Sequence, residues 1–372
     1  MATAARVLWV IKGLGPGGAE GLLVDAAEHL DWDRFSYEAC YLLPWKDQLA
    51  GDLDRAGVQV TCLDVTSPWN PSWVARLRGR LRDGRYDIVH AHLPYTGIGV
   101  RTAVRSMSTA RPAVVYTEHN TWDRYRPATR LLNAWTFGWN DAVIAVSQSV
   151  AASIGRRRMP VNVVPNGIDV GATESNALGR REARSTLGVP DDAFAIGTVG
   201  GLTPKKGHSV LVRAAARVVD SEPSARFVFV GLPAQPSAIE REIAAARLES
   251  HVLLAGYRPG AARLMRAFDV YCLPSLYEGM PISLLEAMAL GVPSVVTSAG
   301  GVPEVVTDGV DALVVPPSDP GALADALVSL AHDDPLRAKL AAEARRTVEG
   351  FDLKEMVRRT EAVYVEALST RR

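Results

Sequence analysis

Residues 275–306, SLYEGMPISLLEAMALGVPSVVTSAGGVPEVV, decide how the rest of the chain is interpreted. The run ISLLEAMAL between Pro281 and Gly291 predicts a helix, because proline suits the first turn of a helix and glycine its C-terminal end. This run is apolar on almost every side, so we expect the helix to be buried all round. The run PSVVTS that follows predicts a buried strand.

Glu286 stands alone in the middle of this apolar helix. An ionised carboxylate in such surroundings costs several kcal/mol unless it accepts hydrogen bonds. Two interpretations remain open. The carboxylate forms an ion pair with Arg263 or Arg266, or it accepts the two hydroxyl donors of a ribose 2′,3′-diol.

Glu278 precedes the helix, begins the segment EGMP (278–281) and lies eight residues before Glu286. The backbone N–H groups of this segment lie at a predicted helix N-terminus, where unpaired donors and the helix dipole favour an anion. The two carboxylates need not share a helix face, so they are poor candidates for a paired acid and base. The order of features fits a sugar, its phosphates and a ribose laid in a line.

The same rhythm of buried strand and helix extends along the whole chain. Continuous Val- and Ile-rich runs alternate with helical stretches, as in RVLWVI (6–11), YDIVHAH (86–92), FAIGTVG (194–200) and RFVFVG (226–231). Such runs are typical of parallel strands with both faces covered, and the alternation predicts an α/β fold of two Rossmann-like domains. We expect an N-terminal domain over 1–170, a polar linker over 171–192, a C-terminal domain over 193–350 and an amphipathic helix over 351–372.

Length and composition agree with two globular domains. The chain has 372 residues, of which 48% are hydrophobic and 22% charged, and its formal net charge is +0. A neutral chain is not expected to bind nucleic acid through bulk charge. Cys40, Cys62 and Cys272 are scattered, which favours a reducing compartment and argues against disulfides or a cysteine metal site. No apolar run approaches the ~18–20 residues that span a bilayer.

Near the N-terminus, IKGLGPGGAE (11–20) contains the pattern G-x-G-x-x-G that occurs in dinucleotide-binding loops. A dinucleotide site also needs an acidic residue at the end of the second strand, to hold a ribose. The second predicted strand, SYEACYLL, has its only acid, Glu38, near its beginning. We therefore expect a glycine turn at a helix N-terminus and no nicotinamide cofactor.

The motif formed by Glu278 and Glu286 resembles the E-x7-E signature of the retaining glycosyltransferases of family 4, which have the GT-B fold. Further segments resemble landmarks of that family in the expected order over nearly the full length. They are GPGGAE (15–20), HAH (90–92), TEHN (117–120), AVSQS (145–149), VPNGID (164–169) and VGGLTPKKGH (199–208). The resemblance implies two domains facing a cleft, with the C-terminal helix returning to the N-terminal domain.

For the C-terminal domain, the resemblance implies a binding site for a nucleoside diphosphate sugar. Glu286 is expected to hold the ribose, and Glu278 to face the hydroxyls of the donor sugar. The backbone of Gly279, Met280 and Pro281 is expected to border the sugar and the phosphates.

Lys206 matches the family lysine that neutralises the diphosphate. Where the family usually has arginine, this chain has Gly201, so a second cation on the diphosphate is missing unless Lys205 replaces it. The resemblance further implies that His119 contacts the donor sugar. Gly17 and Gly18 are expected to approach the diphosphate and the acceptor.

The implied reaction moves a sugar to an acceptor hydroxyl with the anomeric configuration retained. It follows a front-face route, in which the leaving diphosphate helps to deprotonate the acceptor. We expect no metal ion and no cofactor, and a uridine or guanosine diphosphate sugar as the donor. Two alternatives remain open: a nucleotide-sugar epimerase, and a protein that binds a nucleotide sugar without turnover.

The acceptor is expected to be a glycan, a lipid or a small molecule. Residues 73–82 carry Arg76, Arg78, Arg80 and Arg82 beside Trp73 and predict a basic amphipathic helix. Two interpretations remain open: the helix rests on anionic lipid, or it only covers the sheet. The aromatic and basic run 121–139 is interpreted as an acceptor wall or as packing. We expect a cytoplasmic protein. Peripheral contact with the inner face of the cell membrane is a further interpretation.

Overall fold

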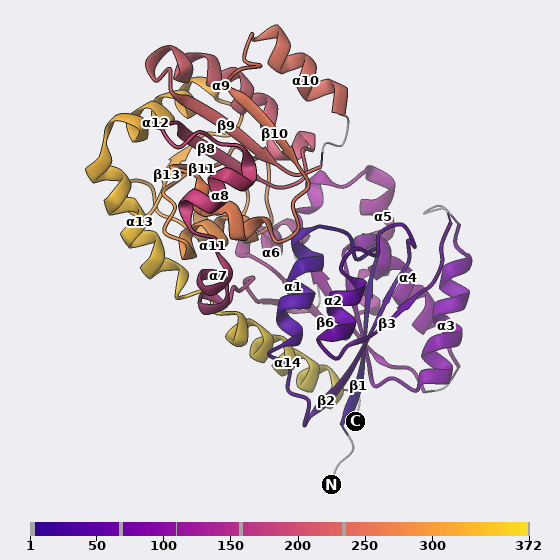
Figure 1. Cartoon of the computed structure of the whole chain (residues 1–372). Helices are drawn as coiled ribbons and strands as arrows, with labels where there is room; N and C mark the ends of the chain where they lie inside the picture. The colour runs from indigo at the N-terminus through magenta and orange to yellow at the C-terminus, as the bar shows by residue number, and fades with distance from the viewer. Residues whose placement is uncertain (1–3, 67–69, 109, 156–158, 233–235, 371–372) are drawn as a thin grey trace. The chain divides into compact units, whose positions relative to one another are not determined.

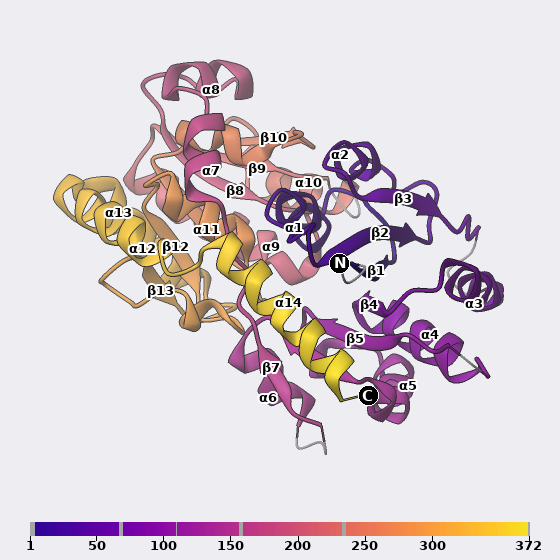
Figure 2. The same ribbon diagram turned by 90° about the horizontal axis from the view of Figure 1, so that it is seen from below.

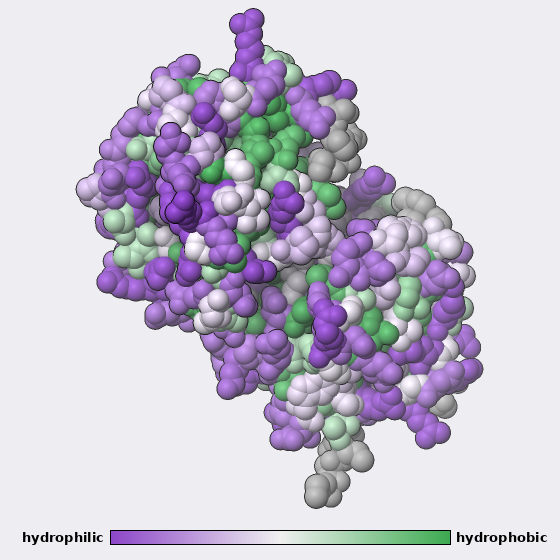
Figure 3. All heavy atoms as spheres, viewed as in Figure 1, coloured by the Kyte–Doolittle hydropathy of each residue, from purple (hydrophilic) through white to green (hydrophobic). Residues whose placement is uncertain are grey.

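The computed structural model describes residues 4–66, 70–108, 110–155, 159–232 and 236–370. The chain divides into two compact units (Figure 1). Unit 1 comprises residues 1–166 together with 353–372, and unit 2 comprises residues 167–352. Hydrophilic residues cover much of the face that Figure 3 presents, with apolar patches between them.

Unit 1 is built on a parallel sheet of seven strands in the order β3-β2-β1-β4-β5-β6-β7. The strands are β1 (Ala5–Ile11), β2 (Phe35–Tyr41), β3 (Gln59–Cys62), β4 (Ile88–His92), β5 (Ala113–Glu118), β6 (Ala142–Ala145) and β7 (Val161–Val163). Every residue of β4 and β5 is buried, as expected for parallel strands covered on both faces. The order reverses at β1, so the carboxyl ends of β1 and β4 form a topological switch point.

Helices cover both faces of this sheet. They are α1 (Gly18–Ala27), α2 (Ala50–Arg55), α3 (Ser72–Gly84), α4 (Pro94–Arg105), α5 (Pro127–Thr136), α6 (Gln148–Ile154) and α14 (Leu353–Ser369), with short 3-10 turns η1 (Trp122–Arg124) and η2 (Phe137–Trp139). The C-terminal helix α14 packs against α1, β5 and β6, and is drawn in yellow in Figures 1 and 2. The predicted return of this helix to the N-terminal domain is therefore confirmed.

Unit 2 has a parallel sheet of six strands in the order β10-β9-β8-β11-β12-β13. The strands are β8 (Phe194–Val199), β9 (Ala225–Val230), β10 (Val252–Gly256), β11 (Val270–Leu273), β12 (Ser294–Thr297) and β13 (Leu313–Val315). The helices are α7 (Val170–Asn176), α8 (Arg180–Leu187), α9 (His208–Ser221), α10 (Pro236–Ala245), α11 (Ile282–Ala289), α12 (Pro320–His332) and α13 (Asp334–Val348). The 3-10 turns are η3 (Pro204–Lys206), η4 (Ala261–Ala267) and η5 (Val302–Glu304). The order again reverses, between β8 and β11.

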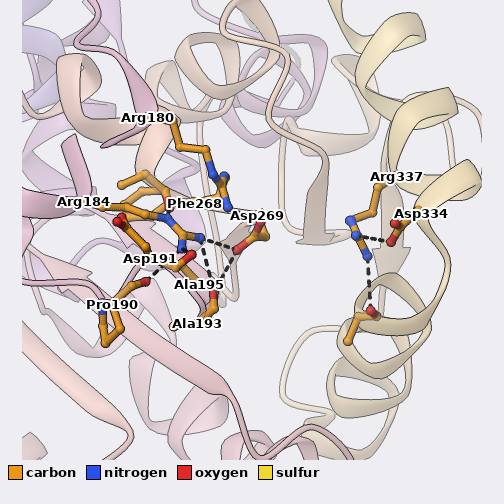
Figure 4. A network of polar contacts seen from close by, with 12 residues as sticks. Arg180, Arg184, Pro190, Asp191, Ala193, Ala195, Phe268, Asp269, Asp334 and Arg337 are labelled. Carbon is orange, nitrogen blue, oxygen red and sulfur yellow. Dashed lines mark hydrogen bonds and ion pairs between the residues drawn. The ribbon is translucent and has the colours of Figure 1, made fainter. Parts of the chain in front are cut away.

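The predicted linker, residues 171–192, contains most of α7 and all of α8 and lies within unit 2. Arg184 on α8 is buried, and its guanidinium donates to Asp269 Oδ2 at 2.7 Å and to the carbonyl oxygens of Ala193, Pro190 and Asp191 (Figure 4). Asp269 in turn accepts the N–H of Ala195 at 2.7 Å. This segment is therefore packed and helical.

None of the helices in the described part of the chain combines the length and the apolar character needed to cross a membrane.

Candidate active site

The candidate site in unit 2 lies at the carboxyl ends of β8 and β11, two neighbouring strands at the switch point. The loop after β8 carries Lys205 and Lys206, and the loop after β11 carries Glu278. The N–H of Leu276 donates to the carbonyl oxygen of Lys205 at 2.8 Å, which ties the two loops together. Adjacent parallel strands end at the same edge, so residues far apart in the sequence meet here.

Glu278 is buried at the centre of this site. Its Oε1 accepts hydrogen bonds from Lys206 Nζ at 2.7 Å and from Ser275 Oγ at 2.6 Å. Burial alone would raise the pKa of the carboxyl, but the ammonium groups of Lys206 and Lys205 and these hydrogen bonds outweigh it and hold the pKa below its usual range. Glu278 is therefore an anion at neutral pH, paired with a partly exposed cation.

Two glycines allow the loops to approach one another. Gly207 has φ +67°, and a Cβ there would lie 1.9 Å from the carbonyl oxygen of Pro274. Gly300 has φ +55°, and a Cβ there would lie 1.8 Å from the carbonyl oxygen of Glu278. Both positions exclude a side chain, so the backbone around Glu278 is held closely on two sides.

Gly201, where the resemblance implies arginine, has a different environment. It is exposed, and the nearest atom to a Cβ there would be 3.9 Å away. The structure thus leaves room for a side chain at this position.

The helix after Glu278 begins at Ile282, with Pro281 as its N-cap in an extended conformation. Gly279, Met280 and Pro281 are buried in the turn that leads into it. Gly291, just beyond the helix, has φ +65°, as predicted for a glycine that ends a helix.

The prediction that this helix is buried on every side is wrong. Ile282, Ser283 and Glu286 are only half-buried, and their spacing places them on one face. The other faces pack against α7, α13 and η4. Glu286 is therefore on a partly open face near Tyr271, whose hydroxyl donates to Ser283 Oγ at 2.7 Å. Arg263, one of the two arginines considered as its ionic partner, donates from Nε to the carbonyl oxygen of Asn176 at 3.1 Å.

A second polar cluster lies in unit 1, at the carboxyl ends of β4 and β5. His119 is half-buried, and its Nε2 lies 3.2 Å from Nδ1 of His92, with the two rings stacked. His90 Nε2 bonds to Thr117 Oγ1 at 2.7 Å and His90 Nδ1 to Tyr364 Oη at 2.6 Å. Burial lowers the pKa of His90 to about 3, so its ring is neutral.

Glu118, which precedes His119, is a residue that the sequence interpretation missed. It is fully buried and accepts hydrogen bonds from Trp122 Nε1 at 2.9 Å, from Tyr116 Oη at 2.7 Å and from Tyr125 Oη. The backbone N–H of His119 also donates to it, at 3.0 Å. Its signal in the sequence is a lone acid at the end of the buried run AVVYTE. Glu118 fixes the backbone that carries His119.

A pocket opens in unit 1 between the sheet, α1 and α14. Its walls are mostly apolar, with Leu22 and Leu23 from α1 and Val357 from α14, and His92 and His119 contribute polar groups. Within the part of the chain that the structure describes, the buried Nε2 of His92 meets no hydrogen-bond partner.

The glycine turn lies at the carboxyl end of β1, as predicted. Gly17 is the N-cap of α1 and Gly18 its first residue, and both are exposed. Lys12 directly follows β1, and burial together with the nearby Lys46 ammonium lowers its pKa. This pair of lysines beside the turn was also missed. Among the described residues, no group of three or more His, Cys, Asp or Glu side chains is arranged to hold a metal ion.

Two family models match the chain. Residues 16–172 match the model described as Glycosyltransferase Family 4, and residues 179–347 match the model described as Glycosyl transferases group 1. These matches cover the loops that carry the two clusters.

Similar proteins match most of the chain. The D-inositol 3-phosphate glycosyltransferase of Kineococcus radiotolerans is 32% identical over 78% of this chain and 74% of its own length. The UDP-Gal:alpha-D-GlcNAc-diphosphoundecaprenol alpha-1,3-galactosyltransferase of Escherichia coli is 25% identical over 87% of this chain and 86% of its own. Among solved structures, Anabaena HepE in complex with UDP-glucose superposes with a TM-score of 0.84 at 24% identity, over 98% of this chain and 99% of that one. The chain therefore belongs to the group 1 glycosyltransferases, and it is a transferase enzyme with the two-domain GT-B fold.

Proposed function

We propose that this enzyme transfers a sugar from a nucleoside diphosphate sugar to an acceptor hydroxyl, with retention of the anomeric configuration. The observation that carries the proposal is the Lys206–Glu278 pair at the switch point of unit 2, followed by Glu286 on the half-open face of α11. Open α/β sheets bind their ligands at such a point.

Lys206 is the proposed partner of the donor diphosphate. In the structure the Lys206 ammonium forms an ion pair with Glu278, and the Lys206 side chain is partly exposed. A diphosphate placed beside it would compete for the same cation, and Glu278 would then accept hydrogen bonds from sugar hydroxyls. Charge-assisted contacts of this kind are worth about 1.5–3 kcal/mol each. Lys205 and the backbone at Gly279 and Met280 complete the proposed phosphate and sugar contacts.

Glu286 is the proposed ribose ligand. A single carboxylate matches the two adjacent hydroxyls of a ribose, and the half-open face of α11 leaves its side chain partly accessible. Anabaena HepE is solved in complex with UDP-glucose, which supports a uridine diphosphate sugar as the first donor to test, with guanosine diphosphate sugars as the second.

Retention is proposed to follow a front-face route. Retaining glycosidases place two carboxyl groups about 5–5.5 Å apart, one as nucleophile and one as acid. Glu278 is instead held by a lysine and a serine hydroxyl. We infer that the leaving diphosphate takes the acceptor proton while Lys206 stabilises its growing charge. This scheme requires no metal ion and no cofactor.

The acceptor is proposed to bind unit 1, beside the exposed Gly17 and Gly18 and the pocket that His92 and His119 line. In this scheme His119 contacts the donor sugar and Glu118 positions it. A glycan, a lipid and a small molecule each remain candidate acceptors.

A panel of UDP-, GDP- and ADP-sugars in a thermal-shift assay tests donor binding. A ligand at about 100 times its Kd adds about 2.7 kcal/mol of stability. We expect one donor class to raise the Tm, and Glu286→Ala to abolish this rise while the free protein keeps its Tm. Glu240→Ala, at an exposed position on α10, is the control and keeps the rise.

Labelled donors then distinguish the reactions. Release of the nucleotide that depends on an acceptor supports transfer. A changed sugar without an acceptor identifies an epimerase, and stoichiometric binding without release identifies a binding protein. If Glu286→Ala unfolds and the wild-type protein binds no donor, the carboxylate is a structural ion-pair partner and the proposal is wrong.

A further inference from the structure

Helix α5 in unit 1 has its polar and apolar faces reversed. Its outward side chains include Leu131, Leu132 and Trp135, which are 71%, 48% and 68% exposed. Its buried side chains include Asn133 and Thr136. A helix on the surface of a globular protein normally shows the opposite pattern, with apolar residues facing the core. The outward face of α5 is therefore built for surroundings other than water.

The orientation of α5 is fixed by a buried cation on the neighbouring helix. Arg101 on α4 is wholly buried, and its Nη2 donates to Asn133 Oδ1 at 2.5 Å. Its Nε donates to the carbonyl oxygen of Gly97 at 2.7 Å. Turning α5 to hide its leucines would take Asn133 away from this guanidinium and leave a buried charge short of acceptors. The exposure of the leucines is thus a stable feature of the fold.

The apolar face continues beyond α5 and is bordered by positive charge. Trp139 in η2 packs edge-on against Trp135, with ring centroids 5.1 Å apart. The Arg105 guanidinium lies 6.0 Å from the Trp139 ring, and Arg126 and Arg130 are exposed at the start of the helix. We call the set Leu131, Leu132, Trp135, Trp139, Arg105, Arg126 and Arg130 the α5 surface.

We propose that the α5 surface docks on the anionic face of a lipid bilayer. Leucine and tryptophan bury apolar area at the boundary of the acyl chains, tryptophan prefers the membrane–water interface, and arginines attract anionic headgroups. A second copy of the chain fits this surface less well. A two-fold contact centred on α5 would bring its arginines toward those of the other copy, because such an interface is self-complementary.

Helix α3, which the sequence singles out for membrane contact, lacks these features in the structure. Its apolar side chains Trp73, Leu77 and Leu81 are buried against the unit. Arg80 pairs with Glu38 at 2.7 Å. The outward face of α3 is basic without an apolar anchor, which makes it a matched control. Figures 1 and 2 show α3 and α5 on either side of α4, and both helices pack against α4.

Co-sedimentation with vesicles tests the proposal. The vesicles contain phosphatidylcholine with an equal part of phosphatidylglycerol, and pure phosphatidylcholine serves for comparison. We expect the full chain to bind the anionic vesicles, and salt to weaken the binding. The double variant Leu131→Ser/Trp135→Ser should lower the partition coefficient roughly tenfold or more. Arg126→Gln/Arg130→Gln should lower it on anionic vesicles alone.

The α3 variant Arg76→Gln/Arg78→Gln removes the same charge from an exposed site and should bind as the wild type does. All the substituted side chains are exposed, and an unchanged Tm and donor-induced shift verify the fold of each variant. The proposal is overturned if the full chain binds no vesicles, or if only the α3 variant loses binding. It is also overturned if the protein forms a dimer that Leu131→Ser/Trp135→Ser abolishes, since the occupant is then a second copy.

Discussion

At the scale of single residues, two carboxyl groups that are both buried have pKa values shifted in opposite directions. Glu118 in unit 1 receives its hydrogen bonds from neutral donors, and burial raises its pKa. Glu278 in unit 2 is also buried, but the lysine ammonium groups beside it lower its pKa. A nearby cation is the difference between them.

This contrast predicts opposite pH dependences of stability. Glu118 binds its proton more tightly in the folded chain, so its contribution to the free energy of unfolding is greatest below the unfolded pKa and declines as pH rises through the folded pKa. Glu278 binds its proton less tightly when folded, so its contribution is present above the unfolded pKa and is lost as pH falls through the folded pKa. Urea denaturation of the wild type, Glu118→Gln and Glu278→Gln from pH 3 to pH 8 measures both.

We expect the stability of Glu278→Gln relative to wild type to be lowest at neutral pH, by about 1–3 kcal/mol, since Lys206 then loses a charged acceptor. That deficit should shrink as the solution is acidified. For Glu118→Gln the relative stability should instead improve as pH rises above the unfolded pKa. If the relative stabilities of the two variants changed with pH in the same direction, the opposite pKa shifts of Glu118 and Glu278 would be contradicted.

At the scale of elements, the loop after β8 contains two glycines with different roles. Gly207 has a positive φ and touches the backbone of Pro274, whereas Gly201 is exposed and open. We therefore expect Gly207→Ala to destabilise the protein by more than 1 kcal/mol, because the Cβ clash cannot be relieved by a side-chain movement. Gly201→Arg should leave the Tm nearly unchanged.

The same Gly201→Arg variant tests the proposed diphosphate site. If the loop borders the donor phosphates, a new cation there should tighten donor binding by roughly tenfold, equivalent to about 1.5 kcal/mol for a charged hydrogen bond. Isothermal titration of the donor measures this, with Gly201→Ala as the uncharged control. Equal affinities for the two variants would place the diphosphate away from this loop.

The elements also show what sequence could and could not predict. The buried parallel strands were predictable, because continuous runs of Val and Ile are typical of strands covered on both faces. The E-x7-E motif also placed Glu278 in the turn before a helix and Glu286 within that helix. The open face of α11 was not predictable. Ile282 and Ser283 look like core positions until the neighbours of the helix are known. The reversal of α5 was hidden for the same reason, since Arg101 is far from Asn133 in the chain.

At the scale of the whole molecule, unit 1 is assembled from two distant parts of the chain. Residues 1–166 form its sheet, and α14 covers part of it. Tyr364 on α14 is fully buried, accepts a hydrogen bond from Trp9 Nε1 at 3.1 Å and bonds to His90 Nδ1 at 2.6 Å. Glu361 accepts one from Tyr37 Oη at 2.7 Å. An amphipathic helix near Phe351 was predictable, but these partners were not, because hydrogen bonds across hundreds of residues leave no local pattern.

The stability of unit 1 should therefore depend on its last helix. Tyr364→Ala removes a buried aromatic ring and both of its polar contacts, and should cost about 3–5 kcal/mol. Tyr364→Phe keeps the ring and removes the hydroxyl from Trp9 and His90, and should cost about 1–3 kcal/mol. Thermal unfolding followed by circular dichroism measures both, with Val365→Ala at an exposed position of α14 as the control.

Such a variant should lose stability in unit 1 while the proposed donor site in unit 2 is retained. Glu278, Lys206 and Glu286 all lie in unit 2, so in Tyr364→Phe the donor-induced rise in Tm should persist for unit 2 even where unit 1 unfolds earlier. Limited proteolysis at increasing temperature identifies which unit is cut first. Cleavage confined to unit 2, or a Tyr364→Ala variant as stable as the control, would show that α14 is an appendage and not part of the core of unit 1.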